Sequence, residues 1–136
     1  MAGKSRKHAS TPKPLPTGAE LDILAALWRI GPATVREVHE QLGKGSGYTT
    51  TLKQMQLMTE KGLLSRSERF RSHVYEAAAP KEQTQNQIAA DVLARAFEGS
   101  AKSLVLGALT AKPASDADLE EIRKMLDEFD KDKGRS

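Results

Sequence analysis

GYTTTLKQMQLMTEKGLLSRSERFRSHVY, residues 47–75, is the stretch that decides the fold of this 136-residue chain. Its first half has Leu52, Met55 and Met58 at three-residue spacing and ends on a glycine, which predicts one amphipathic helix that starts at Tyr48. Helical geometry places Thr51 on the buried side, so the opposite side is short, polar and cationic. Hydroxyl, amide and ammonium groups of this kind can read base edges in a major groove. On an isolated helix the same pattern would be an ordinary solvated face.

The second half of the stretch is typical of a small basic β-hairpin. Residues 64–69 and 72–77 predict two short strands with a two-residue link between them. Arg66, Arg69 and Arg71 therefore gather on one hairpin and its tip, where guanidinium groups could meet phosphates on either side of a groove. A cluster of charges is usually only a solvated face, but this one follows directly after a candidate groove helix.

Two further helices are predicted upstream, each opened by a capping box. Thr17 with Glu20 precedes one apolar run, Thr34 with Glu37 precedes the next, and a glycine follows each of them. The order helix, helix, helix, hairpin is that of the winged helix-turn-helix, whose second helix supports the third across the major groove of DNA. The predicted fold is therefore mostly α with a small β-wing.

Composition narrows the classes of function. The chain has no cysteine, which excludes disulfides and thiolate metal sites, and its three histidines show no metal-ligand spacing. No glycine-rich phosphate loop, nucleophile elbow or catalytic spacing is present in the sequence, so we expect neither an enzyme nor a cofactor. No apolar run approaches the ~20 residues that span a membrane, and no signal-peptide core is found, so we expect a cytoplasmic location. Trp28 is assigned to the core, and His39 to the solvated side of the second helix.

Positive charge is concentrated in the first part of the chain. Residues 1–77 contain 12 lysines and arginines against 7 aspartates and glutamates, whereas residues 78–136 contain 9 against 11. A nucleic-acid surface requires such a distribution. Residues 1–14 hold part of this charge, lack periodicity and are predicted to be a disordered basic arm. That arm either follows DNA phosphates or only keeps the chain soluble.

The C-terminal part shows no strand signal and predicts three more helices, over residues 81–97, after Gly99-Ser100, and from Ser115 to Phe129. They make too little core to bury their apolar stripes alone, so a second copy of the chain is the expected partner. Folding back onto the winged domain in a monomer is the alternative. The predicted domains are a basic arm (1–14), a winged-helix domain (15–79), a helical dimerisation domain (80–131) and a charged tail (132–136). The predicted dimerisation residues are Ile88, Val92, Phe97, Leu104, Val105, Leu109, Leu119, Ile122, Met125, Leu126 and Phe129.

Six short motifs follow one another along the chain: LDILAALW (21–28), YTTTL (48–52), EKGLL (60–64), HVY (73–75), RAFEGS (95–100) and SLVL (103–106). Their order and spacing together resemble the penicillinase-repressor (BlaI/MecI/CopY) family, and the resemblance covers the chain from Leu15 to about Phe129. It implies an N-terminal winged helix, a C-terminal helical dimerisation domain and binding to operator dyads. It also implies repression by occupying the promoter, relieved when the dimer comes apart or releases the DNA.

The sequence departs from the family pattern at several places. Leu57 stands where the family usually has a basic residue, so either one phosphate contact is missing or Leu57 packs against something else. Phe70 stands in a wing turn that usually bears glycine, so we expect a longer tip or an aromatic contact with DNA. Gly107-Ala108 stand where β-lactam-responsive members are cut at an Asn-Phe pair, so either a different protease acts or induction is not proteolytic. Without cysteine, copper sensing by thiolates is not expected.

The predicted function is a transcriptional repressor that binds palindromic operators as a homodimer and blocks promoter access. Its partners are then double-stranded operator DNA, a second copy of the chain and, if induction is proteolytic, an inducing protease, with no membrane. The predicted base-reading residues are Thr49, Thr50, Lys53 and Gln54, and the predicted phosphate-positioning residues are Tyr48, Arg66, Arg69, Arg71 and His73. Packing or capping is the alternative for Tyr48. The alternative function is a winged-helix interaction module that docks a protein through Leu57 and Phe70.

Overall fold

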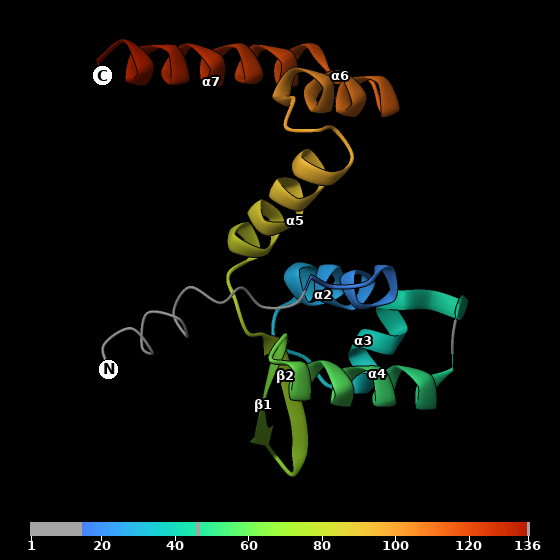
Figure 1. The fold of residues 1–136 in the computed structure, drawn as a ribbon. Coiled ribbons are helices and arrows are strands. Elements are labelled where there is room, and N and C mark those ends of the chain that lie inside the picture. Colours follow the sequence, from blue (N-terminus) through green and yellow to red (C-terminus); the bar gives the residue numbers. More distant parts are fainter. Residues whose placement is uncertain (1–14, 46, 136) are drawn as a thin grey trace. The chain divides into compact units, whose positions relative to one another are not determined.

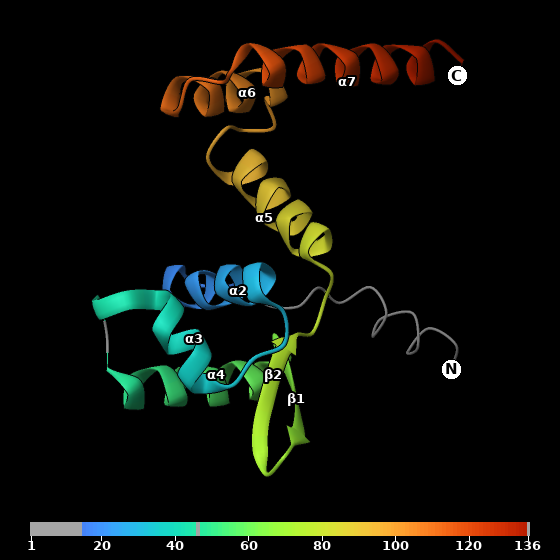
Figure 2. The ribbon, with the colours of Figure 1, turned by 180° about the vertical axis from the view of Figure 1, so that it is seen from behind.

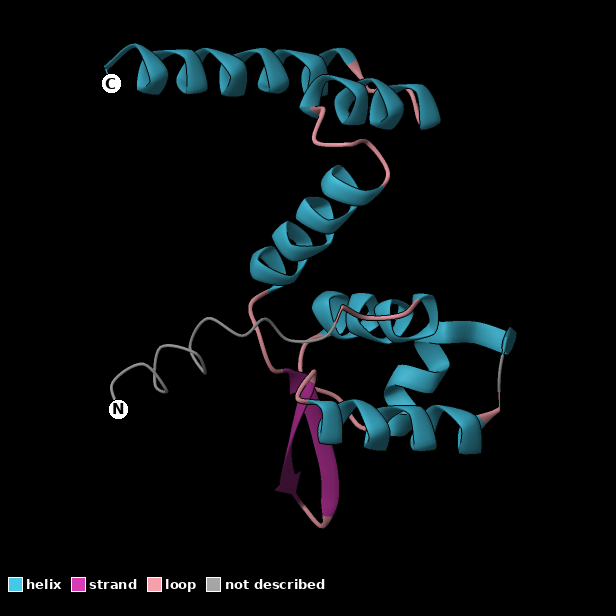
Figure 3. Cartoon of the chain, in the orientation of Figure 1, coloured by secondary structure: helices cyan, strands magenta, loops and turns pink. Residues whose placement is uncertain are grey.

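The computed structural model describes residues 15–45 and 47–135, so the basic arm predicted over residues 1–14 lies outside the described residues (Figure 1). The elements are α2 (Gly18–Ile30), α3 (Val35–Leu42), the 3₁₀ turn η1 (Gly43–Gly45), α4 (Tyr48–Lys61), β1 (Leu64–Arg69), β2 (Ser72–Ala77), α5 (Lys81–Arg95), α6 (Ala101–Ala111) and α7 (Asp116–Arg135). The chain packs as two compact units, the first ending at Ala89 and the second beginning at Ala90, within α5. The described part of the chain consists of helices and one two-stranded hairpin (Figure 3), which confirms the predicted mostly α fold with a small β-wing.

Side-chain caps fix where α2 and α3 begin. The Thr17 hydroxyl accepts a hydrogen bond from the Glu20 amide at 3.2 Å, and the Glu20 carboxylate accepts one from the Thr17 amide at 3.0 Å. Thr34 and Glu37 make the same reciprocal pair, at 3.2 and 2.8 Å. Each box satisfies amides that the first helical turn leaves without a backbone partner. Both predicted capping boxes are confirmed.

Helix α4 has the bounds and the buried side that the sequence predicts. Met55 and Met58 are 0% exposed, Thr51 is 2% exposed and Leu52 is half-buried. A left-handed glycine, Gly62 with a φ of 86°, ends the helix and donates its amide to the last turn. The core beneath α4 comes from α2, α3 and the hairpin as well. Its buried apolar residues are Ile23, Leu24, Ala26, Leu27, Ala33, Val35, Val38, Met55, Met58, Leu63, Leu64 and Tyr75.

The hairpin has a two-residue turn. Strands β1 and β2 pair antiparallel, and Arg69 opposite Ser72 is the last pair before the tip. Phe70 and Arg71 form the turn, with φ angles of 51° and 67°. Two left-handed residues in a two-residue loop match a type I′ turn, whose twist suits a hairpin. The expectation of a longer tip is therefore wrong, and the short tip carries the aromatic ring.

The base of the hairpin is tied to the connection between α2 and α3. Tyr75 exchanges two backbone hydrogen bonds with Ala33, at 2.8 and 2.9 Å, so Ala33 acts as a one-residue third strand. Tyr75 is 1% exposed and Val74 is 8% exposed. On β1, Leu64 is buried and the rest of the strand is exposed. The hairpin is thus anchored at its base, and residues 65–73 are exposed to solvent.

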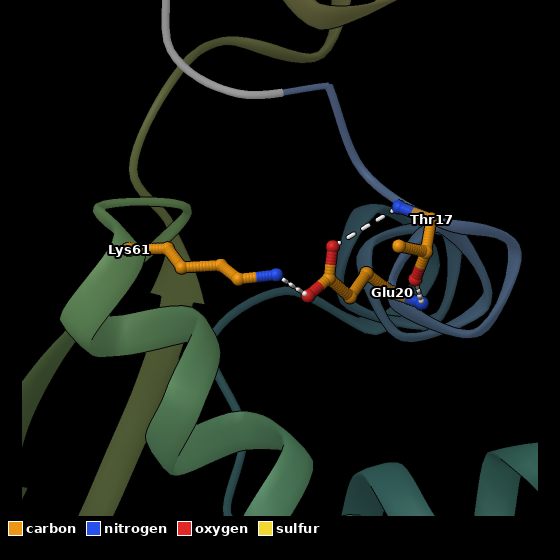
Figure 4. A network of polar contacts seen from close by, with 3 residues as sticks. All are labelled: Thr17, Glu20 and Lys61. Carbon is orange, nitrogen blue, oxygen red and sulfur yellow. Dashed lines mark hydrogen bonds and ion pairs between the residues drawn. The ribbon is translucent and has the colours of Figure 1, made fainter.

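An ion pair joins the start of α2 to the end of α4 (Figure 4). Lys61 Nζ lies 2.5 Å from Glu20 Oε2, although only the lysine side chain is substantially exposed, at 45% against 4%. Burial by itself would raise the pKa of Glu20. The hydrogen bonds from Lys61 and Thr17 and the positive charge of Lys61 outweigh burial and hold that pKa below its ordinary value. Glu20 therefore caps α2 and also fixes α4 against it.

The second unit consists of the end of α5 with α6 and α7. Ser100 and Ser115 cap α6 and α7, each accepting a hydrogen bond at 3.1 Å from the amide three residues later. Helix α7 continues to Arg135, past Phe129, where the predicted helix ends. Basic residues near a helix C-terminus suit the helix dipole, which favours this extension into the charged segment. Among the described residues, no helix is long and apolar enough to cross a membrane and no cluster of side chains could hold a metal ion.

Candidate DNA-binding surface

The outward side of α4 carries a stripe of polar side chains. Thr49, Lys53 and Gln56 are exposed and follow one another at spacings of four and three residues, so they lie on one line along the helix. Leu57 adjoins this stripe and is 42% exposed. The stripe offers a hydroxyl, an ammonium group, an amide and an apolar contact. Together these groups can recognise donors, acceptors and methyl groups on base edges.

Two of the predicted base-reading residues lie on the flank of α4 that faces α2. Thr50 and Gln54 line a groove together with Asp22 and Arg29 from α2. Thr50 is exposed and Gln54 is half-buried. Gln56 is exposed on the outward stripe, although Gln54 and not Gln56 was predicted to read bases. Contact of Thr50 and Gln54 with bases stays a prediction.

A cluster at the start of α4 contains a cation that the sequence analysis missed. The guanidinium carbon of Arg36 lies 5.2 Å from the centroid of the Tyr48 ring, and the His39 ring meets that ring edge-on with centroids 6.0 Å apart. His39 Nδ1 also lies 3.4 Å from the Thr51 hydroxyl. His39 is thus half-buried against α4, with one side in contact with Tyr48 and Thr51. Tyr48 packs here too but stays 39% exposed, so its predicted phosphate contact remains a prediction.

The arginines of the hairpin point to both of its faces. Side chains alternate along a strand, and residues paired across a hairpin share a face. Arg66 pairs with Tyr75 and Arg69 pairs with Ser72, so the two arginines lie on opposite faces. Arg71 lies in the turn, and all three arginines are exposed. The hairpin therefore presents guanidinium groups to either side and at its tip.

His73 belongs to β2, where it pairs with Glu68 of β1. Its Nε2 is 3.7 Å from Glu68 Oε2 across the hairpin, and the two side chains are 49% and 71% exposed. His73 also lines a groove with Arg36 and Tyr48, which brings three of the candidate phosphate contacts around one hollow. Glu68 is a carboxylate within this basic region, so a phosphate that binds His73 must compete with it.

Helix α4 and the hairpin lie at the same side of the first unit. In Figures 1 and 2, α4 lies on the side away from α2, and the hairpin extends past α4 in the same direction. An exposed polar helix beside a basic two-stranded wing defines the winged-helix class of DNA-binding regulators.

The comparison with known families gives the same class. A family model described as penicillinase repressor matches residues 16–128, so the chain belongs to the penicillinase repressor family. This confirms the resemblance seen in the six motifs. Members of the family are transcriptional regulators rather than enzymes. Among the curated proteins, the chain has no significant match.

Proposed function

We propose that this chain is a transcriptional repressor that binds palindromic operator DNA as a homodimer and blocks access to the promoter. The observation that carries the proposal is the exposed polar stripe of α4 beside a hairpin with three exposed arginines, on one side of the first unit. A DNA duplex is the partner whose major groove admits an exposed helix and whose phosphates attract guanidinium groups. The family supports the same function.

The binding surface divides into base-reading and phosphate-holding groups. Thr49, Lys53 and Gln56 face the bases, and Leu57 offers an apolar contact to a thymine methyl group. Thr50 and Gln54 reach the edge of the site from the α2 side. The groups that hold phosphates are Arg36, Tyr48, Arg66, Arg69, Arg71 and His73.

The second unit supports the homodimer. Within residues 101–133 no side chain is buried, and five large apolar side chains are between 49% and 73% exposed. These five are Val105, Leu106, Met125, Leu126 and Phe129. All of them except Leu106 were predicted dimerisation residues. The remaining predicted residues are half-buried: Ile88, Val92, Phe97, Leu104, Leu109, Leu119 and Ile122. A second copy presents the same apolar stripe about a two-fold axis, and two copies place two α4 helices on the half-sites of a palindrome.

DNA recognition is tested by selecting bound fragments from random duplex DNA with the purified full chain, and then titrating the selected duplex at several salt concentrations. We expect a short palindrome and a linear fall of log affinity with log salt. Lys53→Ala and Arg71→Ala should weaken binding and flatten the salt dependence, by about one slope unit for each phosphate that the variant no longer neutralises. Lys102→Ala removes a positive charge from an exposed position of α6 and is the matched control.

Two outcomes would contradict these assignments. If Lys53→Ala and Arg71→Ala both kept the wild-type affinity and slope, neither residue would belong to the interface. If only random, salt-labile fragments were recovered, specific operator recognition would be excluded.

The dimer is tested by sedimentation equilibrium of the full chain. Leu126→Glu places a charge in the exposed apolar stripe of α7 and should shift the chain toward monomer, with a parallel loss of affinity for the palindrome. Arg123→Glu introduces the same residue at a polar, 68% exposed position of the same helix and should leave the dimer intact. A wild-type chain that sediments as a monomer while it binds the palindrome would refute the homodimer.

Gly107–Ala108 remains the candidate cleavage position if induction is proteolytic. Both residues lie inside α6, and a Cβ atom at Gly107 would contact the Phe97 ring at 3.4 Å. A protease therefore needs local unwinding of α6 before it can reach this bond. Mass spectrometry of the chain from induced cells should show fragments that end at Gly107. Release of the promoter with the chain intact would exclude proteolysis.

A protein-docking module is the second candidate function. The exposure of Leu57 and Phe70, 42% and 94%, favours it, because Leu57 adjoins the polar stripe of α4 and Phe70 stands in the turn at the tip of the wing. On this alternative no duplex is selected, and Leu57→Ser loses a partner protein that the wild type captures. Recovery of a palindrome by the wild type would exclude it as the main function.

A further inference from the structure

The tip of the hairpin presents one aromatic ring to solvent. Phe70 is 94% exposed, more than any other large apolar side chain in the described part of the chain. It stands in a two-residue turn in which both residues are left-handed, a conformation that asparagine and glycine adopt with less strain. Neither packing nor turn geometry accounts for a phenylalanine at this position.

Positive charge surrounds this ring. Arg69 precedes it, Arg71 follows it, and Arg66 lies on the opposite face of the hairpin from Arg69. Glu68 is the only carboxylate in residues 64–75, and His73 lies opposite it. A narrow groove with a phosphate strand on each side complements an apolar ring flanked by guanidinium groups.

The length and direction of the hairpin suit a minor groove. Six paired residues at a rise of ~3.3 Å make a hairpin of roughly 20 Å. The minor groove lies about half of a ~34 Å helical turn away from the major groove. Because the hairpin extends past α4 on the same side (Figures 1 and 2), its tip would meet the minor groove next to the major groove that α4 occupies.

We propose that Phe70 is a wedge that enters the minor groove of the operator, partly unstacks one base step and bends the duplex. Arg69 and Arg71 then hold the phosphates on the two strands. This inference rests on the proposed function, since it requires that α4 bind the neighbouring major groove. The wedge implies a preference for operators that contain easily opened pyrimidine–purine steps. These steps lie where the tip enters, and no side chain reads them by hydrogen bonds.

Phe70→Asn tests the wedge without threatening the fold, because asparagine tolerates the left-handed turn better than phenylalanine does. Phe70→Leu is the conservative variant, since leucine is also an apolar wedge. Both full-length variants and the wild type are compared on a duplex of about four helical turns (~40 base pairs) that carries the sequence selected by the wild type. The readouts are affinity, the end-to-end distance by fluorescence energy transfer, and the fluorescence of 2-aminopurine placed at the flanking pyrimidine–purine steps.

The wild type and Phe70→Leu should bend the duplex by tens of degrees and raise the 2-aminopurine fluorescence. Phe70→Asn should lose the bend, the fluorescence rise and about tenfold in affinity. Wild-type bending and unstacking by Phe70→Asn would overturn the wedge and leave the proposed function standing. A wild-type chain that selects no duplex would overturn the proposed function and the wedge with it.

Discussion

Lys61→Met removes the positive partner of Glu20 and keeps an apolar side chain in its place. The Glu20 carboxylate, at 4% exposure, is then left with its hydrogen bond from the Thr17 amide. Removing one partner of a fully buried ion pair costs about 3–5 kcal/mol. Lys61 is 45% exposed, and solvent screens the pair, so we expect the free energy of unfolding at pH 7 to fall by about 2 kcal/mol.

Glu20→Gln should lower the free energy of unfolding by about 1 kcal/mol, which is less than for Lys61→Met, because Glu20 is buried and Lys61 is half-exposed. A glutamine oxygen can still accept from the Thr17 amide, and the half-exposed ammonium group of Lys61 can turn into water. The lysine variant instead leaves a buried charge without its counter-ion. The order of the two losses is therefore a test of which partner is buried.

The pH dependence separates the two variants. In the wild type the pKa of Glu20 lies below its ordinary value of 4.5, so its contribution to stability is present above pH 4.5 and is lost as the pH falls through the folded-state pKa. The difference in free energy of unfolding between the wild type and Glu20→Gln should therefore become smaller only below pH 4.5. In Lys61→Met, the hydrogen bond and the positive charge of the lysine no longer lower the pKa of Glu20, so this pKa rises from its wild-type position. The stability loss of Lys61→Met should therefore become smaller as the pH falls through this raised pKa, where protonation removes the buried charge.

Urea denaturation followed by tryptophan fluorescence measures these losses. Trp28 is the only tryptophan of the chain and packs against the core of the first unit, so its emission reports on that unit. A loss of about 2 kcal/mol also corresponds to a fall of roughly 10 °C in melting temperature for a unit of this size. Wild-type stability of Lys61→Met at pH 7, or a deficit that stays constant down to pH 4, would refute the account of this pair.

Three further changes test local features of the fold. Thr34→Ala removes the side-chain cap of α3 and should lower the free energy of unfolding by about 1 kcal/mol in urea, while Thr34→Ser should restore most of it; equal midpoints for both variants would contradict the cap. Arg71→Gly relieves a left-handed φ of 67° and should raise that free energy by about 1 kcal/mol even though it removes a proposed phosphate contact, so a lower midpoint would show that the turn is not strained. Gly107→Ala places a Cβ atom at an ordinary 3.4 Å from the Phe97 ring and should stabilise α6 by about 0.5–1 kcal/mol in thermal melts followed by circular dichroism, whereas a lower melting temperature would show that the helix requires glycine there.

Features that act within one turn of chain were predictable from the sequence. The threonine and glutamate of each capping box bond within three residues, and the glycines after α2, α3 and α4 end those helices locally. The two strands and their link were also predicted, because the register follows once the turn is two residues long. Interactions between residues close in sequence thus made the order of the elements and the bounds of the first three helices predictable.

Features that depend on the packing of one helix against another were not predictable. Glu20 and Lys61 are 41 residues apart, and nothing in either local pattern pairs them. Arg36 lies within the capping box of α3 at an exposed position, but only the approach of α4 brings it over the Tyr48 ring. The rotation of α4 against α2 likewise decides that Gln54 flanks the groove, because Gln54 and Gln56 differ little on an isolated helix.

The anchoring of the hairpin at its base has an evolutionary consequence. Its buried side chains are Leu64, Val74 and Tyr75, and the backbone bridge to Ala33 is at the same end. From there to the turn the side chains contribute nothing to the core, so substitutions among them carry no folding penalty beyond that of the turn itself. Under the proposed function, a lineage or a protein engineer can therefore change the outer wing to suit a new operator while the rest of the domain stays as it is.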